Sequence, residues 1–265
     1  MTRLHTLTLT LTLSAAAILA QTPQPEMTCN DRWGSQDQPS HCEIKEFTVA
    51  ATGRLSVNGG ANGGATIKGW SRGDVLVRAK IQAQGETDAE AHAIAGQVRI
   101  STAGSEVRAE GPGTGRRSNW AVSYEVFIPR QTDVSVKTHN GGIRLADVRG
   151  RIEFAAVNGG ISLARLAGSV HGSTTNGGLH IDLAGNHWDG EGLEASSTNG
   201  GVTMNVPANY SARLETGTVN GGMHVDFPVT VQGEVGRRLS LTLGAGGALV
   251  RATTTNGGVT IRKQG

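Results

Sequence analysis

Residues 138–183 read THNGGIRLADVRGRIEFAAVNGGISLARLAGSVHGSTTNGGLHIDL, and the tripeptide Asn-Gly-Gly occurs in them three times, 18 residues apart. The tripeptide returns at longer intervals further along the chain. Its asparagines are Asn140, Asn158, Asn176, Asn199, Asn220 and Asn256. A recurrence of about 20 residues is the signature of a solenoid, in which one short unit stacks on the next. Two further copies, at Asn58 and Asn62, lie before this array and outside it.

Aligning the six copies on the asparagine gives the same pattern in each. The residues three and five positions after it are apolar, and the residue between them is polar or charged, as in Ile161, Ser162 and Leu163. The residue six positions before it is apolar and the residue two before it is small, as in Ile152 and Ala156. This alternation predicts two half-buried strands per copy, joined at the Asn-Gly-Gly corner.

Asparagine tolerates the left-handed backbone region and glycine adopts positive φ freely, so we expect the tripeptide to form a sharp corner. An ordinary hairpin turn is the alternative, but the regular period favours parallel coils. Stacked coils would place each asparagine about 4.8 Å from the next, where the side-chain amides can form a hydrogen-bonded ladder. The sequence therefore predicts an all-β fold: a parallel β-solenoid (β-helix) over residues 131–265, in repeats of about 18–23 residues. "GAGG" at residues 244–247 looks like a degenerate corner.

Residues 44–130 are predicted to form an irregular β-rich N-terminal part with one short helix. Thr87 and Glu90 form a capping box, and good helix formers follow, so we expect a helix over about residues 88–96. We expect this part to cover one end of the solenoid, while "VTIRKQG" at residues 259–265 leaves the other end short and basic.

Residues 1–20 have the features of an export signal: Arg3, then an apolar, Thr-rich run, then small residues before Gln21. We expect cleavage after Ala20, with Ala17 as a second choice. The run is too short and too rich in threonine to favour a membrane anchor, and no second long apolar run follows. The mature chain is therefore predicted to have no transmembrane segment and to be periplasmic, extracellular or at the cell surface.

Residues 21–43 read as a polar linker that contains the two cysteines, Cys29 and Cys42. In an exported protein such a pair predicts a disulfide. There are two alternatives. The cysteines could bind zinc together with His41, or they could remain two free thiols.

The composition excludes some classes of partner. The formal net charge of +2 is spread along the chain, which gives no footprint for nucleic acid and no polybasic stretch for a membrane surface. The phosphate-loop, dinucleotide-binding and zinc-protease motifs are absent from the sequence, so we expect no cofactor.

Glu194 and Glu215 fall in one column of the alignment, five residues before the asparagine. Read in chain order they lie one repeat apart, about 5 Å, which would resemble a retaining glycosidase pair or hold a cation. The alternative, which we favour, is a solvated strand face. His180 and His224 also share a column, but Thr203 separates them by two spacings, too far for one metal ion.

His187 and Trp188 lie in an insertion before Asn199. An exposed tryptophan on a loop can stack on a sugar ring, so both residues are weak candidates for ligand contact. The alternative, which we favour, is that Trp188 folds back to cover the solenoid.

From Glu43 to Lys263 the chain resembles a bacterial "putative adhesin" family, a domain of unknown function. The resemblance rests on FTVAATGRLSVNGG (47–60), ETDAEAHAIAGQVRI (86–100), YEVFIPRQTDVSVKTHNGGIRL (124–145), the serial Asn-Gly-Gly copies and TTTNGGVTIRK (253–263). It implies an exported β-solenoid with a role in surface adhesion, and some relatives are linked to envelope stress. It supplies no catalytic residues.

We therefore expect an exported, non-enzymatic protein that binds or scaffolds a protein or polysaccharide at the cell envelope or surface. Parallel β-helices also host polysaccharide lyases and hydrolases, so a carbohydrate-active enzyme is one alternative, resting on fold analogy. A regulatory protein that senses envelope damage through a protein partner is another.

Overall fold

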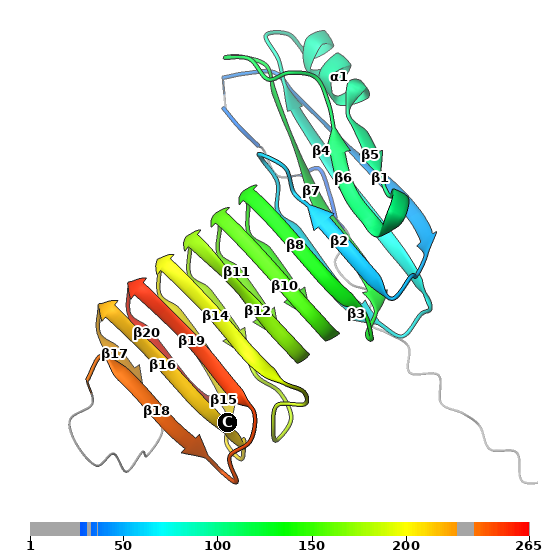
Figure 1. Ribbon diagram of the computed structural model, residues 1–265. Helices are drawn as coiled ribbons and strands as arrows, with labels where there is room; N and C mark the ends of the chain where they lie inside the picture. Colours follow the sequence, from blue (N-terminus) through cyan, green and yellow to red (C-terminus); the bar gives the residue numbers. More distant parts are fainter. Residues whose placement is uncertain (1–26, 31–32, 36, 227–235, 265) are drawn as a thin grey trace, which may run out of the picture.

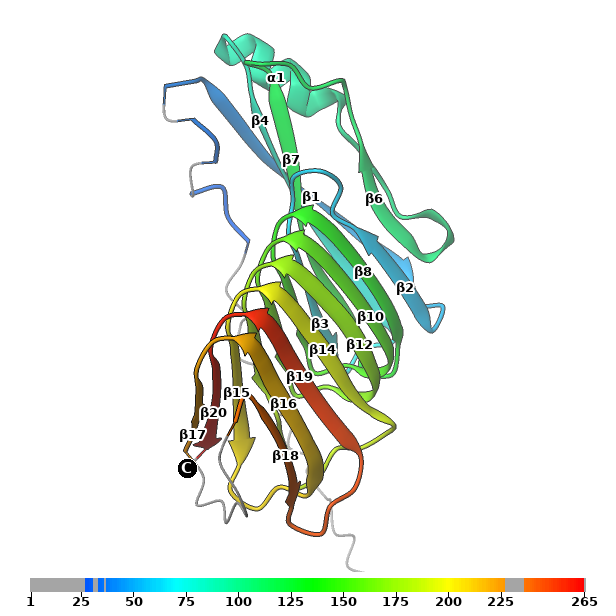
Figure 2. The ribbon, with the colours of Figure 1, turned by 60° about the vertical axis from the view of Figure 1, so that its left-hand side comes forward.

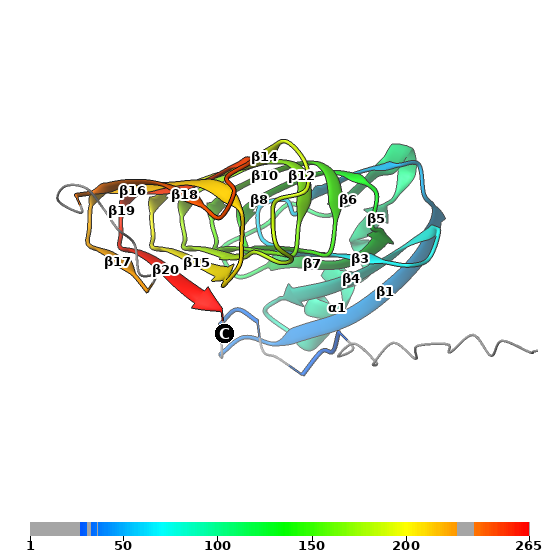
Figure 3. The same cartoon turned by 90° about the horizontal axis from the view of Figure 1, so that it is seen from below.

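The computed structural model describes residues 27–30, 33–35, 37–226 and 236–264. The signal peptide predicted at residues 1–20 lies outside them. The described chain is mostly β-strand and forms two large, mostly parallel sheets of ten strands each, with one α-helix (Figure 1). Figure 3 shows the two sheets facing each other as layers. No helix in the described ranges is long and apolar enough to cross a membrane.

In spatial order, sheet A consists of β1 (Ser40–Ala50), β4 (Asp74–Gln84), β7 (Asn119–Pro129), β3 (Ala65–Trp70), β9 (Ile143–Ala146), β11 (Ile161–Ala164), β13 (Leu179–Asp182), β15 (Val202–Pro207), β20 (Val259–Gln264) and β17 (Met223–Val225). Sheet B consists of β18 (Arg238–Leu243), β16 (Ala212–Asn220), β19 (Leu249–Asn256), β14 (Gly192–Asn199), β12 (Ala167–Asn176), β10 (Arg149–Asn158), β8 (Asp133–Asn140), β2 (Arg54–Asn58), β6 (Glu106–Glu110) and β5 (Arg99–Ser101).

Each copy of the repeat forms one rung, defined as a strand of sheet B, the Asn-Gly-Gly corner and the following strand of sheet A. Neighbouring rungs pair in parallel and in register, so that Asn158 lies opposite Asn140 on one side and Asn176 on the other. The apolar columns face inward and are buried between the sheets, as Ile152, Ile161 and Leu163 illustrate. The period-2 pattern of each strand therefore supplies one layer of the core per rung.

The two sheets continue through the N-terminal part. β2 pairs in parallel with β8, and β3 pairs in parallel with β9, so both strands extend the stack. We expected an irregular N-terminal part, and these regular pairings correct that expectation. Beyond them, β7 pairs in parallel with β3, and β4 and β1 extend sheet A further by antiparallel pairing.

Helix α1 (Asp88–Gln97) packs against β1 and β4 through its buried residues Ala91, Ile94 and Ala95. The Thr87 hydroxyl accepts a hydrogen bond from the Glu90 amide at 3.2 Å, and the Glu90 carboxylate accepts one from the Glu86 amide at 2.8 Å. These bonds satisfy amide groups that have no partner within the helix. A 3-10 turn, Ala103–Ser105, follows β5.

The stacking order departs from the chain order near the far end of the molecule. β19 lies between β14 and β16, and β20 lies between β15 and β17 (Figures 1 and 2). The last rung in the chain is therefore inserted between the two rungs that precede it. β18 pairs antiparallel with the outer side of β16.

This order corrects two expectations. "GAGG" is not a corner of the stack but the turn that leads from β18 to β19. The stack does not end at residues 259–265, because β20 has a neighbour on each side; among the described strands β17 and β18 form that end.

Candidate functional site

The asparagines of the repeat lie in one row along the corner between the sheets. Each Nδ2 atom donates a hydrogen bond to the Oδ1 atom of a neighbouring asparagine, at 2.8–3.0 Å. The row runs Asn62, Asn140, Asn158, Asn176, Asn199, Asn256 and Asn220. Each asparagine inside the row uses one donor and one acceptor in it, which leaves a second donor and a second lone pair without a partner in the row; at one end, the Asn62 Nδ2 atom donates to the Asn119 Oδ1 atom at 3.5 Å.

Asn62 belongs to this row, which corrects our placing of that copy outside the array. The sequence around Asn62 also indicated that it belongs to the row. Ala65 and Ile67 stand three and five residues after Asn62, and both are buried in β3 like the corresponding residues of the other rungs. Asn58 ends β2, so the corner between β2 and β3 is longer than in the other rungs.

Most corners do not use positive φ, which corrects the reason we gave for the Asn-Gly-Gly sequence; the exceptions are Gly60, with a φ of 65°, in the longer corner after Asn58, and Gly257, with a φ of 157°. None of the corner asparagines has a positive φ, and neither do the glycines at 159, 160, 177 and 178. The first glycine is instead required by stacking: a Cβ atom on Gly177 would lie 2.2 Å from the Gly159 carbonyl oxygen of the neighbouring rung. Only glycine allows the two backbones to approach so closely.

A second row, of hydroxyl groups, lies just inside the corner. Each hydroxyl donates to the carbonyl oxygen of a first glycine, at 2.7–2.8 Å. The donors are Thr138, Thr174, Ser197, Thr218 and Thr254. These bonds satisfy acceptors beside the core, where an unpaired carbonyl would be costly.

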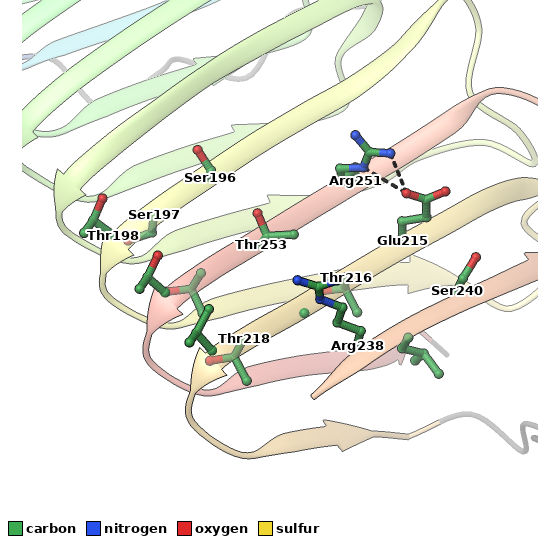
Figure 4. A pocket seen from close by; sticks show the side chains of 15 residues that line it. Ser196, Ser197, Thr198, Glu215, Thr216, Thr218, Arg238, Ser240, Arg251 and Thr253 are labelled. Carbon is green, nitrogen blue, oxygen red and sulfur yellow. Dashed lines mark hydrogen bonds and ion pairs between the residues drawn. The ribbon is translucent and has the colours of Figure 1, made fainter. Parts of the chain in front are cut away.

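Glu194 and Glu215 are not neighbours, contrary to our reading in chain order. Arg251 of the inserted rung lies between them, opposite Glu194 on one side and Glu215 on the other. Its guanidinium donates to Glu215 at 2.6 and 2.9 Å (Figure 4) and lies 3.5 Å from Glu194. The hydrogen bond to Glu215 raises the pKa of Arg251. A cation thus occupies the space that a glycosidase leaves for substrate and water between its carboxyl groups.

An open groove of about 720 Å³ surrounds this ion pair on the outer face of sheet B (Figure 4). β14, β19, β16 and β18 supply its lining, which is mainly hydroxyl side chains with Arg251, Glu215 and Arg238. Arg238 has no ion-pair partner among the described residues.

Trp188 is a buried residue and not an exposed stacking platform. Its side chain is 5% exposed, belongs to the core, and donates a hydrogen bond from Nε1 to the Gly168 carbonyl at 2.9 Å. His187 is exposed, with Nδ1 2.7 Å from the Asn186 side-chain oxygen. The structure therefore does not bring these two side chains together with Glu194 or Glu215 into one site.

His180 and His224 lie further apart than chain order predicts, because Thr260 of the inserted rung joins Thr203 between them. Each histidine contacts an aspartate of its own strand region: His180 is 3.3 Å from Asp182, and His224 is 2.5 Å from Asp226. Within the described ranges, no three His, Cys, Asp or Glu side chains are grouped so that they could hold a metal ion.

Cys29 and Cys42 form a disulfide, with their Cα atoms 5.8 Å apart. It ties the segment before β1 to the start of that strand. The Gln84 side-chain amide holds the same segment, accepting from the Ser35 amide at 3.2 Å and donating to the Ser35 carbonyl at 2.8 Å. We call residues 27–30, 33–35 and 37–39 the N-terminal arm.

Residues 66–262, from β3 to β20, match the profile of the Toastrack DUF4097 family. The chain belongs to the Toastrack DUF4097 family. The Toastrack match thus includes the rungs from β8–β9 onward, with the inserted β19–β20 pair, and it begins within β3, after β1 and β2.

Two solved structures resemble this Toastrack chain at low identity. A "putative cell adhesion protein" of Clostridium sporogenes is 13% identical, with a TM-score of 0.47 over 84% of this chain and 100% of its own. A "putative adhesin" of Bacteroides fragilis is 11% identical, with a TM-score of 0.41 over 84% of this chain and 97% of its own. No curated protein has a sequence that matches this chain.

Proposed function

We propose that this Toastrack protein is an exported, non-enzymatic β-solenoid of the adhesin type, which binds or scaffolds a polymer or protein at the cell envelope or surface. Two features support export: the signal-like sequence of residues 1–20 and the Cys29–Cys42 disulfide, a bond that persists in oxidising compartments.

The observation that carries the proposal is the pair of continuous polar faces that the stacked rungs present to solvent. On sheet B, outward side chains align across neighbouring rungs because the register is exact. Examples are Ser173, Ser196 and Thr253, which lie opposite one another on β12, β14 and β19. A surface with one spacing and repeated hydroxyl groups fits a ligand that is itself extended.

The carbohydrate-active enzyme is the less favoured function. It rests on fold analogy, and the carboxylate pair considered beside it, Glu194 and Glu215, is separated by Arg251, which pairs with both. Glu194, Arg251 and Glu215 thus form a row of paired charges on the open outer face of sheet B, and such a row fits binding better than hydrolysis. Hydrolysis needs one carboxyl group kept as an acid and one as a base or nucleophile.

Two measurements on the native protein test this function. In the first, intact cells and cells whose outer layer has been opened are treated with protease. An exported chain should be degraded in the intact cells or, if it lies beneath the outer layer, only in the opened cells. Purified mature chain should sediment with isolated cell envelopes. A chain that stays in the cytoplasmic fraction, or that fails to sediment, would contradict the proposal.

A further inference from the structure

A second groove, of about 900 Å³, crosses the outer face of sheet A beside the asparagine row. It runs across six consecutive strands (β7, β3, β9, β11, β13 and β15), which corresponds to roughly 24 Å at one strand spacing per step. Its floor is formed by the second glycine of each corner, at Gly64, Gly142, Gly160, Gly178 and Gly201. We call it the glycine groove. None of the candidate residues singled out from the sequence for ligand contact lines it.

Packing does not explain the glycine at every position of this floor. A Cβ atom on Gly160 would meet its nearest neighbour, the Gly178 carbonyl oxygen, at 3.5 Å, an ordinary contact, whereas the first glycines would clash at about 2.2 Å. Gly160 also lies outside the left-handed region and is exposed to solvent. A side chain there would fit the fold but would stand in the groove. At Gly160 the glycine therefore keeps the groove open, whereas at Gly64, Gly142, Gly178 and Gly201 a Cβ atom would meet a backbone oxygen at 3.0–3.2 Å, so close packing also favours glycine there.

The walls of the groove are polar and carry positive charge. On one side stand the outward residues of the sheet A strands, and on the other stand Asn62 and Asn140, with unused amide donors and acceptors. The outward residues are Thr66, Arg144, Ser162, His180 and Thr203. Arg144 has no carboxylate partner among the described residues, and the described lining contains no aspartate or glutamate. An unpaired arginine in such a surface favours a carboxylate or phosphate on the ligand.

The N-terminal arm supplies the remaining wall, through Met27 and Trp33. Figure 3 shows this blue segment on the outer side of the layer that contains β15 and β20. The disulfide and the two hydrogen bonds between Gln84 and Ser35 fix the arm at this place. Trp33 is only partly buried, so the wall of the groove includes part of the surface of its indole, an apolar ring that carries an N–H group.

We propose that the glycine groove binds an extended anionic glycan, one that carries carboxylate or phosphate groups; this inference rests on the proposed envelope-binding function. The hydroxyl and amide side chains repeat at the strand spacing of about 4.8 Å, as the sugars of a linear glycan repeat along its length. A peptide strand fits less well, because the groove crosses the face of sheet A, where the backbone groups are already paired and cannot accept an added strand.

Calorimetric titration of the mature chain tests the ligand class with three hexasaccharides: a uronate hexamer from alginate, a phosphorylated linear mannan hexamer and uncharged cellohexaose. We expect one or both anionic hexamers to bind at least tenfold more tightly than cellohexaose, and a uronate monomer to bind at least tenfold more weakly than its hexamer. Comparing the two anionic hexamers identifies the preferred anion. Equal affinity for charged and uncharged hexamers, or for monomer and hexamer, would overturn the ligand class.

Two matched variants test the place of binding. Gly160→Gln puts a side chain in the groove, and Gly258→Gln puts the same side chain at the same corner position outside it, where a Cβ atom meets its nearest neighbour at 3.6 Å. We expect equal unfolding midpoints and a tenfold or greater loss of affinity for Gly160→Gln alone. Arg144→Gln and Trp33→Ala provide a second test that leaves the corners untouched, and each should weaken binding at least fivefold.

The outcomes separate the two proposals. If wild-type chain binds envelopes and anionic hexamers but all groove variants bind as well as Gly258→Gln, the groove is the wrong site and the envelope function stands. If wild-type chain binds envelopes but no hexamer, and protease treatment of the envelopes abolishes binding, the ligand is a protein and the glycan inference is wrong. If wild-type chain does not bind envelopes, the proposed function itself fails.

Discussion

At the scale of single residues, each corner of the stack contains three types of residue with separate structural roles. The asparagine bonds to its neighbours along the row, the inner threonine or serine satisfies a carbonyl, and the first glycine lets adjacent backbones approach. The sequence identifies these positions correctly because each recurs at a fixed offset. It misidentifies the role of glycine, since a need for positive φ and a need for close approach both select the same residue.

The two glycines of one corner should therefore respond differently to the same change. Gly177→Ala places a Cβ atom 2.2 Å from the backbone of the next rung, and we expect it to lower the free energy of unfolding by about 2–3 kcal/mol. Gly160→Ala, with its nearest contact at 3.5 Å, should change it by less than about 1 kcal/mol. Urea unfolding of both variants measures the difference, and equal losses would contradict the stacking explanation.

Asp147, which follows β9, and Arg165, which follows β11, form a charged pair between neighbouring rungs, with hydrogen bonds of 2.8 and 2.6 Å. The hydrogen bond from Arg165 lowers the pKa of Asp147 below its ordinary value. A lowered pKa in the folded state contributes stability above the ordinary pKa of about 4, and that contribution disappears as the pH falls through the folded value. The pair is partly exposed, so its contribution is below about 1 kcal/mol.

Asp147→Asn tests this pH dependence without changing the backbone, because asparagine also tolerates the left-handed φ of 60° at this position. We expect the variant to be less stable than wild type at pH 7, and the difference to shrink as the pH falls below about 4. Thermal unfolding from pH 7 to pH 3 measures it. Asp37→Asn, which removes a carboxylate with no ion pair among the described residues, is the control for the loss of one negative charge.

At the scale of the elements, the sequence predicts which side of each strand faces the core but not the order in which the rungs stack. Rungs share the same apolar and polar columns, so exchanging two of them leaves every inward residue inward. Charge was the signal that distinguished the orders. Chain order places Glu194 beside Glu215, whereas insertion of the last rung places Arg251 between them and pairs all three.

Engineered disulfides can establish this order in solution. Glu194→Cys combined with Arg251→Cys joins residues opposite each other on neighbouring strands, at a spacing a disulfide can bridge. Glu194→Cys combined with Glu215→Cys joins strands two spacings apart, about 10 Å, which a disulfide cannot bridge. We expect mild oxidation followed by peptide mapping to find the first cross-link and not the second. The reverse result would show that the rungs stack in chain order.

At the scale of the whole molecule, the two sheets run without interruption from the N-terminal strands to β17 and β18. A division at residue 130 follows a change in sequence pattern, yet β3 pairs with β9 and β2 pairs with β8 across it. The long-range pairing of β2 and β3 was hidden in the sequence because only half of their rung keeps the repeat pattern. Each rung depends chiefly on its immediate neighbours, as in other stacked repeats.

We therefore expect one cooperative unfolding transition, with no separate step for residues 44–130. Calorimetry should show a single peak, and amide hydrogen exchange should be slowest in β10 and β12, which have neighbours on both sides, and fastest in β17 at the edge. Two transitions that divide near residue 130 would show that the N-terminal part folds as a separate unit.

The inserted rung has a consequence for how the protein is made. β16 and β17 leave the ribosome before β19 and β20, yet the later pair must lie between them and the earlier rungs. The nascent chain therefore cannot complete this end in the order of synthesis, and any early pairing of β16 with β14 must open again. A cut that removes residues 249–264 would strip a neighbour from both β14 and β16 at once. Loss of this segment would therefore expose unpaired strand edges inside the stack, where a degradative protease can act.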